Sequence, residues 1–127
     1  MLGTNDLKTE FNRSVEEIAQ ATQQLVELIQ DKTEKYSGTS ARILLVSPIL
    51  IDSDAPMHKE WYSDHYDTSS LEKSKELAVQ LERVAKTTGR LFVDAVQVAR
   101  AGKDGVHFDE ASHGTLGELL AHKINDQ

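Results

Sequence analysis

Residues 42–48 read Arg-Ile-Leu-Leu-Val-Ser-Pro, a continuous apolar run that ends at a proline. Residues 90–95 repeat the pattern as Arg-Leu-Phe-Val-Asp-Ala. Unbroken apolar runs of this length are typical of strands buried on both faces of a parallel sheet, because half-exposed antiparallel strands alternate polar and apolar side chains. The two runs therefore predict two central strands of a parallel sheet.

A long amphipathic helix is predicted before the first strand, over residues 14–35. Ser14 followed by Glu17 is a capping box, in which the hydroxyl and the carboxylate satisfy backbone amides at a helix start. The segment Tyr36-Ser37-Gly38 is predicted to end the helix. The residues expected to face the core recur at helical spacing and form an apolar stripe. They are Val15, Ile18, Thr22, Leu25, Leu28 and Ile29.

Two further helices are predicted after the first strand. The one over residues 70–88 has a second candidate capping box at Ser69 and Glu72, and Gly89 is its stop signal. The last helix is predicted over residues 109–124. Its apolar side chains are Leu116, Leu119, Leu120 and Ile124.

The order helix–strand–helix–strand–helix predicts an α/β fold, a three-layer sandwich around a parallel sheet with right-handed crossovers. No repeat or linker interrupts residues 1–127, so we expect a single domain. Residues 1–3, Met-Leu-Gly, look like the end of a third strand, but a strand needs about five residues. Two strands and a stub make a sheet too small to cover its helices. We therefore expect that the N-terminal part of the domain is missing.

Composition excludes several classes of protein. The 127-residue chain has no run near the ~20 apolar residues of a membrane-spanning helix, and its start lacks the basic and apolar regions of a signal peptide. The absence of cysteine excludes disulfides, thiolate zinc sites and cysteine nucleophiles, and it favours a cytoplasmic location. A net charge of −7 repels phosphate backbones, so we expect no nucleic-acid partner.

Polar residues follow each predicted strand. They are Gly3-Thr4-Asn5-Asp6 after the stub, Ser47-Pro48 after the first full strand, and Asp104-Gly105-Val106-His107 in the loop after the second. Ligands of open α/β sheets bind beyond the carboxyl ends of the strands. We therefore expect these three segments to gather at one edge of the sheet.

Two pairs of alternatives stay open on these residues alone. Asp104 could accept the Nδ1 proton of His107 and leave Nε2 free as a general base, or His107 could be a surface residue beside a common Asp-Gly turn. Short motifs give many false positives, which favours the second alternative here. Asn5 could donate to a developing oxyanion, or Asn5 or Asp6 could cap a helical turn after a bend at Gly3.

Taken together and in this order, the segments resemble the SGNH (GDSL-type) hydrolase family, in its arylesterase and acyl-hydrolase branch. Residues 1–8 resemble that family's third block, and residues 104–117 resemble its final block. The resemblance implies a flavodoxin-like fold and hydrolysis of small acyl esters or thioesters through a serine acyl-enzyme, with no metal or cofactor. It implies that His107 is the base, Asp104 its orienting acid, Asn5 the oxyanion-hole amide and Gly3 the glycine of the third block.

The chain departs from the family at the nucleophile. The family's serine lies in a Gly-Asp-Ser block near the N-terminus, and this sequence contains no such tripeptide. None of the serines here lies in such a setting. Ser47 precedes a proline at a strand end, Ser14 and Ser69 look like helix caps, and Ser112 lies at the opening of the final helix. The chain therefore resembles the C-terminal part of such a domain, and we expect it to be inactive alone. The alternative is a non-catalytic α/β module that forms homo-oligomers through an unpaired sheet edge. A complete small flavodoxin-like domain is less favoured, because a glycine-rich phosphate loop is missing.

Residues 49–68 form a long connection rich in acids, histidines and aromatic side chains. The His and Asp spacings do not match a helical pair of metal ligands, so no metal site is predicted. Its aromatic residues could wall an acyl pocket or a subunit contact, or could pack the connection onto the domain, and the sequence favours neither alternative. They are Trp61, Tyr62 and Tyr66.

Overall fold

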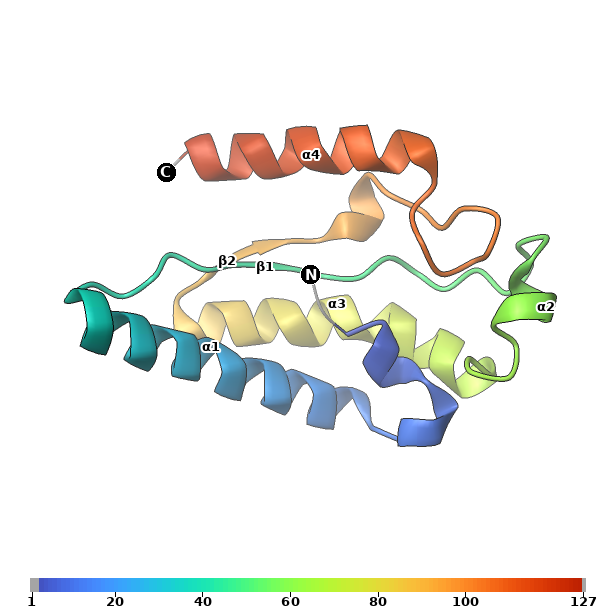
Figure 1. Cartoon of the computed structure of the whole chain (residues 1–127), viewed down its shortest axis with the longest axis horizontal. Helices are drawn as coiled ribbons and strands as arrows, with labels where there is room; N and C mark the ends of the chain where they lie inside the picture. Colours follow the sequence, from blue (N-terminus) through green and yellow to red (C-terminus); the bar gives the residue numbers. More distant parts are fainter. Residues whose placement is uncertain (1–2, 127) are drawn as a thin grey trace.

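The computed structural model describes residues 3–126, and its elements follow the predicted order with one short helix added (Figure 1). The helices and strands are α1 (Val15–Ser37), β1 (Leu44–Val46), α2 (His58–Trp61), α3 (Thr68–Thr88), β2 (Leu91–Val93) and α4 (Glu110–Asn125). Single turns of 3-10 helix are η1 (Asn5–Leu7), η2 (Thr9–Phe11) and η3 (Ala95–Gln97). In this part of the chain no helix is long and apolar enough to cross a membrane.

The predicted start of α1 is confirmed. The Ser14 hydroxyl accepts from the Glu17 backbone N–H at 3.1 Å, and the Glu17 carboxylate accepts from the Ser14 N–H at 2.7 Å. Gly38 ends the helix in the left-handed conformation at φ 74°. Both ends of α1 therefore follow from local sequence.

The predicted capping box of α3 is wrong. The helix begins at Thr68, and the Asp67 carboxylate caps it by accepting from the Ser70 N–H at 2.9 Å. Ser69 consequently lies inside the first turn. A carboxylate two residues earlier provides an equivalent acceptor for the free amides of the first turn, so the helix starts sooner. Gly89 ends α3 as predicted.

β1 and β2 pair in parallel, with Leu45 opposite Phe92, which confirms the α/β fold class. Each strand has three residues, fewer than the apolar runs predicted. The expectation that β1 is buried on both faces is wrong, because all three of its residues are half-buried. Within residues 3–126 the sheet is only two strands wide, so it is too narrow to cover the helices that pack on it. The third-strand stub begins at Met1 and Leu2, which lie outside the described residues, and Gly3 belongs to no strand.

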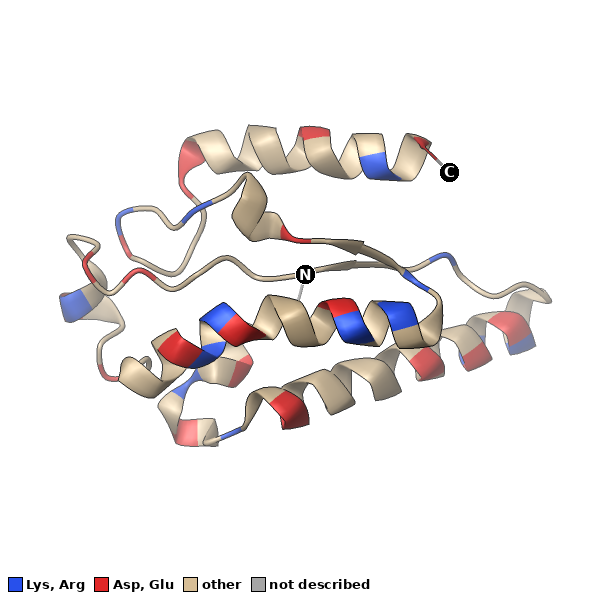
Figure 2. Ribbon diagram, turned by 180° about the vertical axis from the view of Figure 1, so that it is seen from behind, with Lys and Arg blue, Asp and Glu red and all other residues tan. Residues whose placement is uncertain are grey.

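The helices lie in two layers. α1 and α3 run along one face of the sheet and α4 covers the other (Figure 1). One apolar cluster contains Ile18 of α1 with Leu77 and Leu81 of α3, and a second contains Val93 of β2 with Leu116 of α4. Charged residues lie on the helices and loops, and neither strand carries one (Figure 2). The sheet therefore forms the middle layer, with one apolar cluster on each face.

Candidate functional site

The loop between η3 and α4 carries Asp104 and His107. Gly105 gives the loop its tight bend at φ 78°, and a Cβ there would collide with the carbonyl oxygen of Asp52. The Gly105 carbonyl accepts from the Asp52 N–H, and the Lys103 carbonyl accepts from the Met57 N–H, each at 2.9 Å. The loop is therefore fixed to the connection that precedes α2.

Asp104 is bound on both carboxylate oxygens. Its Oδ1 accepts from the backbone N–H groups of Val106 and His107, each at 2.9 Å, and its Oδ2 lies 2.7 Å from Nδ1 of His107. Burial alone would raise the pKa of Asp104, but the hydrogen bonds from Val106 and His107 outweigh it, so the pKa is lowered. A carboxylate beside Nδ1 orients the imidazole and places its free nitrogen at Nε2.

His107 itself is accessible. Its side chain is 71% exposed, whereas that of Asp104 is 16% exposed. Within residues 3–126, Nε2 of His107 has no hydrogen-bond partner. A partly buried orienting acid beside an accessible base is an arrangement suited to proton transfer to or from a ligand.

Asn5 lies in the 3-10 turn η1, and it is not the cap of that turn. The cap position is Thr4, and η1 has no side-chain cap. Asp6 forms an ion pair with Arg13. Asn5 Oδ1 accepts a hydrogen bond from the Tyr66 hydroxyl at 3.4 Å. The capping alternative for Asn5 and Asp6 therefore finds no support in the structure.

Gly3 has a structural reason to be glycine. Its φ is 121°, and a Cβ there would lie 2.8 Å from Cδ2 of Leu77. The backbone of residue 3 therefore approaches α3 more closely than any side chain allows. Gly3 and Asn5, two residues later, both line the cavity described next.

The structure places the two predicted segments around one cavity of about 270 Å³. Asn5 and His107 both line it, although they are far apart in sequence. Its remaining walls are Gly3, Thr4, Asp6, Ile49, Val106 and Phe108. The catalytic roles of Asn5, Asp104 and His107 stay predictions. Asn5 and His107 line the same cavity, and Asp104 is connected to it through its hydrogen bond with His107.

The serines lie away from this chemistry. Ser47 is fully buried, and its hydroxyl donates to Asp94 and accepts from the Ala95 N–H, so it ties the ends of β1 and β2 together. Ser112 is also buried, and its hydroxyl accepts from the Arg100 N–H. Ser14 caps α1. None of these three lines the cavity.

The aromatic residues of the connection have different surroundings. Tyr66 is 2% exposed and belongs to the apolar cluster, so it packs the connection onto the domain. Tyr62 packs against that cluster, and its ring centroid is 6.0 Å from that of His107. Trp61 is half exposed and lines a second hollow beside His107. Among the residues described, no group of three His, Cys, Asp or Glu side chains could hold a metal ion.

Sequence reasoning missed the contact between Tyr66 and Asn5. The two residues are 61 positions apart, and no local pattern connects them. The only signal was the density of aromatic residues in the connection, which did not show where each side chain points.

Comparison with solved structures finds close likenesses. The M. smegmatis aryl esterase matches with a TM-score of 0.87 and 32% identity, over 99% of this chain and 58% of the esterase. A carbohydrate acetylesterase from Sinorhizobium meliloti matches with a TM-score of 0.88 and 29% identity, over 99% and 58%. The chain therefore matches part of the structure of SGNH arylesterases and carbohydrate acetylesterases. This confirms the resemblance stated from the sequence.

The chain spans less than two thirds of the SGNH proteins that it matches. A carbohydrate acetylesterase family member, also from Sinorhizobium meliloti, matches at 25% identity and a TM-score of 0.78, over 98% of this chain and 60% of its own. No protein-family model and no curated protein matches the sequence. The similarity to SGNH hydrolases therefore depends on structure and on the resemblance of the segments around Asn5 and His107.

Proposed function

We propose that this chain supplies the acid–base pair and an oxyanion-hole donor of a serine esterase that hydrolyses small acyl esters. The observation that carries the proposal is the cavity shared by Asn5 and His107. The Asp104–His107 pair supports it, since an imidazole held at Nδ1 presents Nε2 to a nucleophile. The likeness to an aryl esterase and to a carbohydrate acetylesterase favours ester substrates.

The reaction would proceed through an acyl-serine. The serine oxygen bonds to the ester carbonyl carbon while Nε2 of His107 takes the hydroxyl proton, and the Asn5 amide donates to the oxygen that becomes negative. The bond to the alcohol then breaks, and the alcohol leaves with the proton from His107. Water adds to the acyl-serine with the same proton transfers, which releases the acid and restores the serine. The serine belongs to the family's Gly-Asp-Ser block, which these 127 residues do not contain.

The size and walls of the cavity favour a small acyl group. A volume of about 270 Å³ lies near the lower end of ligand pockets, and Ile49, Val106 and Phe108 give it apolar sides. Such a site suits a short acyl chain better than a long lipid tail.

The test is to fuse this chain to the segment of the M. smegmatis aryl esterase that it does not span. A fluorophosphonate probe should label the folded fusion, which should hydrolyse a short-chain aryl ester, whereas the chain alone should show neither activity. His107→Ala and Asn5→Ala in the fusion should lower the rate by roughly 100-fold or more. Full activity of a folded His107→Ala fusion would contradict the proposal. Labelling of the chain alone that one Ser substitution abolishes would instead place the nucleophile within it.

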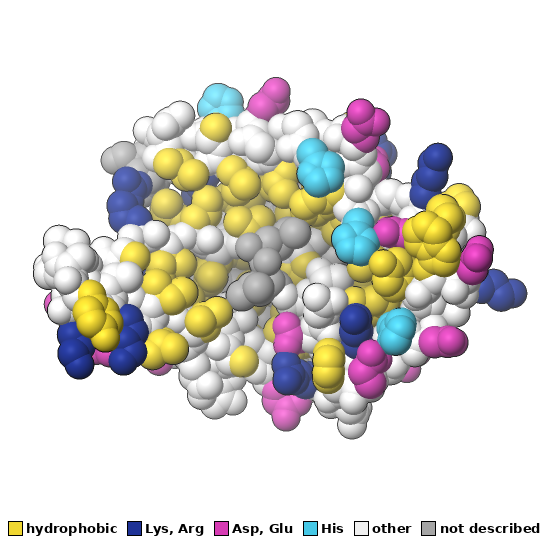
Figure 3. All heavy atoms as spheres, viewed as in Figure 1, with side chains coloured by type: hydrophobic (Ala, Val, Ile, Leu, Met, Phe, Trp, Pro, Cys, Tyr) yellow, Lys and Arg dark blue, Asp and Glu magenta, His cyan; other side chains and the backbone are white. Residues whose placement is uncertain are grey.

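A second candidate function is assembly through the open side of the sheet. The outer side of β1 and the neighbouring face of α1 form an apolar hollow lined by Leu25, Ile29 and Leu44. Figure 3 shows hydrophobic side chains gathered on the face between α4 and α1. Such patches favour association. Light scattering after size exclusion separates the candidates, since a monodisperse, folded monomer would count against the assembly function.

A further inference from the structure

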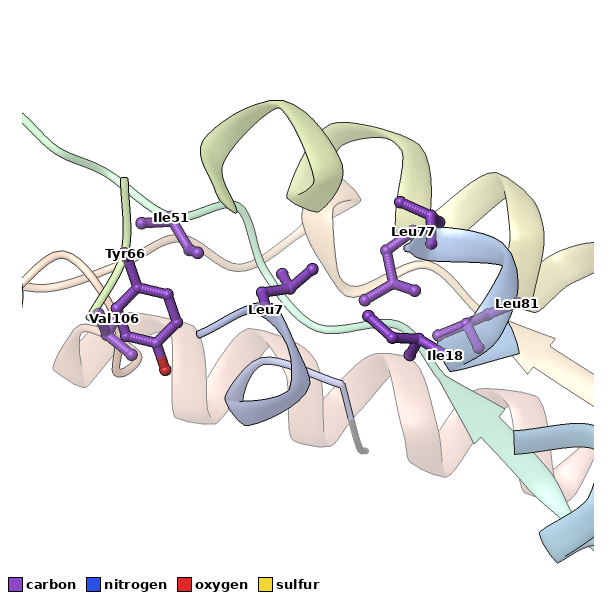
Figure 4. Close-up of a cluster of buried hydrophobic side chains, with 8 residues drawn as sticks. Leu7, Ile18, Ile51, Tyr66, Leu77, Leu81 and Val106 are labelled. Atoms are coloured by element: carbon purple, nitrogen blue, oxygen red, sulfur yellow. The ribbon is translucent and has the colours of Figure 1, made fainter. Parts of the chain in front are cut away.

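Tyr66 connects the buried core to the candidate site. Its hydroxyl donates to Asn5 Oδ1 at 3.4 Å, across 61 positions of sequence. The ring is 2% exposed and packs in the cluster that contains Leu7, Ile51 and Val106 (Figure 4). Leu7 belongs to the same turn as Asn5, and Val106 precedes His107. The ring is therefore held by both segments that form the cavity.

The Tyr66 hydroxyl keeps its proton. Burial, with smaller effects of Tyr62 and Glu10, raises its pKa to about 12. A neutral hydroxyl in a buried ring needs an acceptor, and in the described part of the chain Asn5 Oδ1 is its only one. An amide whose oxygen accepts this bond turns its NH2 group away from the tyrosine.

Tyr62 extends the contact to the base. Its ring lies 6.2 Å from the ring of Tyr66 and 6.0 Å from that of His107, measured between centroids, and both pairs are tilted. Aromatic pairs at these separations attract one another. The connection before α3 thus contacts the oxyanion-hole amide through Tyr66 and the imidazole through Tyr62.

We propose that Tyr66 is a positioning residue that holds the carboxamide of Asn5 with its NH2 group directed into the cavity shared with His107. The role rests on the proposed esterase function, in which that NH2 group donates to the oxyanion. Preorganised donors of this kind need to be fixed before the substrate arrives, because reorientation during the reaction would cost part of their effect. Tyr66 supplies that restraint from the core.

The test is nuclear magnetic resonance on this chain itself, with Tyr66→Phe as the variant and Tyr62→Phe as the matched control. The variant removes one hydroxyl and keeps the ring that packs in the core. In Tyr66→Phe, the side-chain amide signals of Asn5 should shift toward those of Asn12, whose side chain forms no hydrogen bond in the described part of the chain, and the couplings that report the χ1 angle of Asn5 should become averaged. Tyr62→Phe should leave the Asn5 signals unchanged.

Unchanged Asn5 signals in a folded Tyr66→Phe variant would overturn the proposal. Should that variant not fold, the unmodified chain still decides the question. The couplings of Asn5 must then report a single χ1 angle, because an averaged χ1 angle would show that the carboxamide is not held and would also overturn the proposal. Neither measurement needs turnover. A fusion without esterase activity would refute the proposed function, whereas the magnetic resonance measurements alone decide the positioning role of Tyr66.

Discussion

Asp104 concentrates three hydrogen bonds on one carboxylate, which makes it the residue on which the shape of its loop depends most. Two of its donors are backbone N–H groups, and the third is the imidazole of His107. An ionised acceptor forms stronger hydrogen bonds than a neutral one. The charge of Asp104 therefore serves the loop as well as the candidate base.

Asp104→Asn is expected to destabilise the chain by about 1–3 kcal/mol at neutral pH, because the amide is a weaker acceptor and one side of it cannot accept. The pKa of Asp104 is lower in the folded than in the unfolded chain. The unfolded chain thus binds its proton first, and the stability that the carboxylate provides is lost as pH falls below roughly 4. Urea unfolding between pH 7 and pH 2 should show that the difference in the free energy of unfolding between wild type and Asp104→Asn becomes smaller as pH falls. The exposed Asp31→Asn serves as control, and a difference that does not change with pH would contradict the prediction.

The pKa of Tyr66 is shifted in the opposite direction, so its effect on stability is predicted at alkaline pH. Its pKa of about 12 lies above the ordinary value, so the folded chain holds this proton more tightly than the unfolded chain does. The contribution of the protonated Tyr66 hydroxyl to the free energy of unfolding is complete below about pH 10 and declines as pH rises toward 12. Tyrosinate absorbance should show one late ionisation that Tyr66→Phe removes and that Tyr36→Phe, at an exposed position, does not. Three tyrosines ionising together near pH 10 would be inconsistent with the buried hydroxyl.

At the scale of elements, the loop between η3 and α4 depends on the connection that follows β1. Gly105 is the point of closest approach, because Asp52 and His58 fill the space where a side chain would be. By contrast, Gly114 and Gly117 lie in α4 with nothing near the position of a Cβ. Packing therefore requires glycine at position 105 and does not require it at positions 114 and 117.

Gly105→Ala should destabilise the chain by about 2 kcal/mol or more, since alanine is strained at positive φ and its methyl group meets backbone atoms. Gly114→Ala should stabilise it by roughly 0.5–1 kcal/mol, because alanine restricts the unfolded chain and fits a helix. Both values can be measured by urea unfolding. Equal effects of the two substitutions would show that the loop does not pack as described.

At the scale of the whole molecule, the two edges of the sheet are open. An apolar hollow lies between α1 and β1, and a second hollow of mixed lining, which includes Glu82 and Lys123, lies between α3, β2 and α4. Leu28 of α1 is 51% exposed beside the first hollow. The α1 side of the molecule therefore exposes apolar side chains that neither strand covers.

Leu28→Lys should weaken any self-association through this side without lowering stability, because the leucine is exposed in the monomer. Ile124→Lys is the matched control, since Ile124 is 52% exposed on α4 and away from the first hollow. Light scattering across a concentration series is the measurement. An equal effect of both substitutions would mean that association has no preference for the α1 side.

Much of this fold could be predicted because its signals are local. The caps of α1 and the apolar runs of β1 and β2 can be read from neighbouring residues. The length and burial of β1 could not, because they depend on which strands lie beside it. The meeting of Asn5 and His107 followed from the rule that parallel strands end at one edge of the sheet. The contacts of Tyr62 and Tyr66 could not be predicted, since they depend on the path of a long connection.

The connection between β1 and α3 supports both sides of the cavity, and this has a consequence for engineering. A randomised library aimed at new substrates would lose function quickly if it varied Tyr66, because that ring is packed among residues from both sides. Trp61 is half exposed and borders His107 from the same connection. Substitutions at Trp61 would change the surroundings of the His107 imidazole and leave the packing of Tyr66 in the core unchanged.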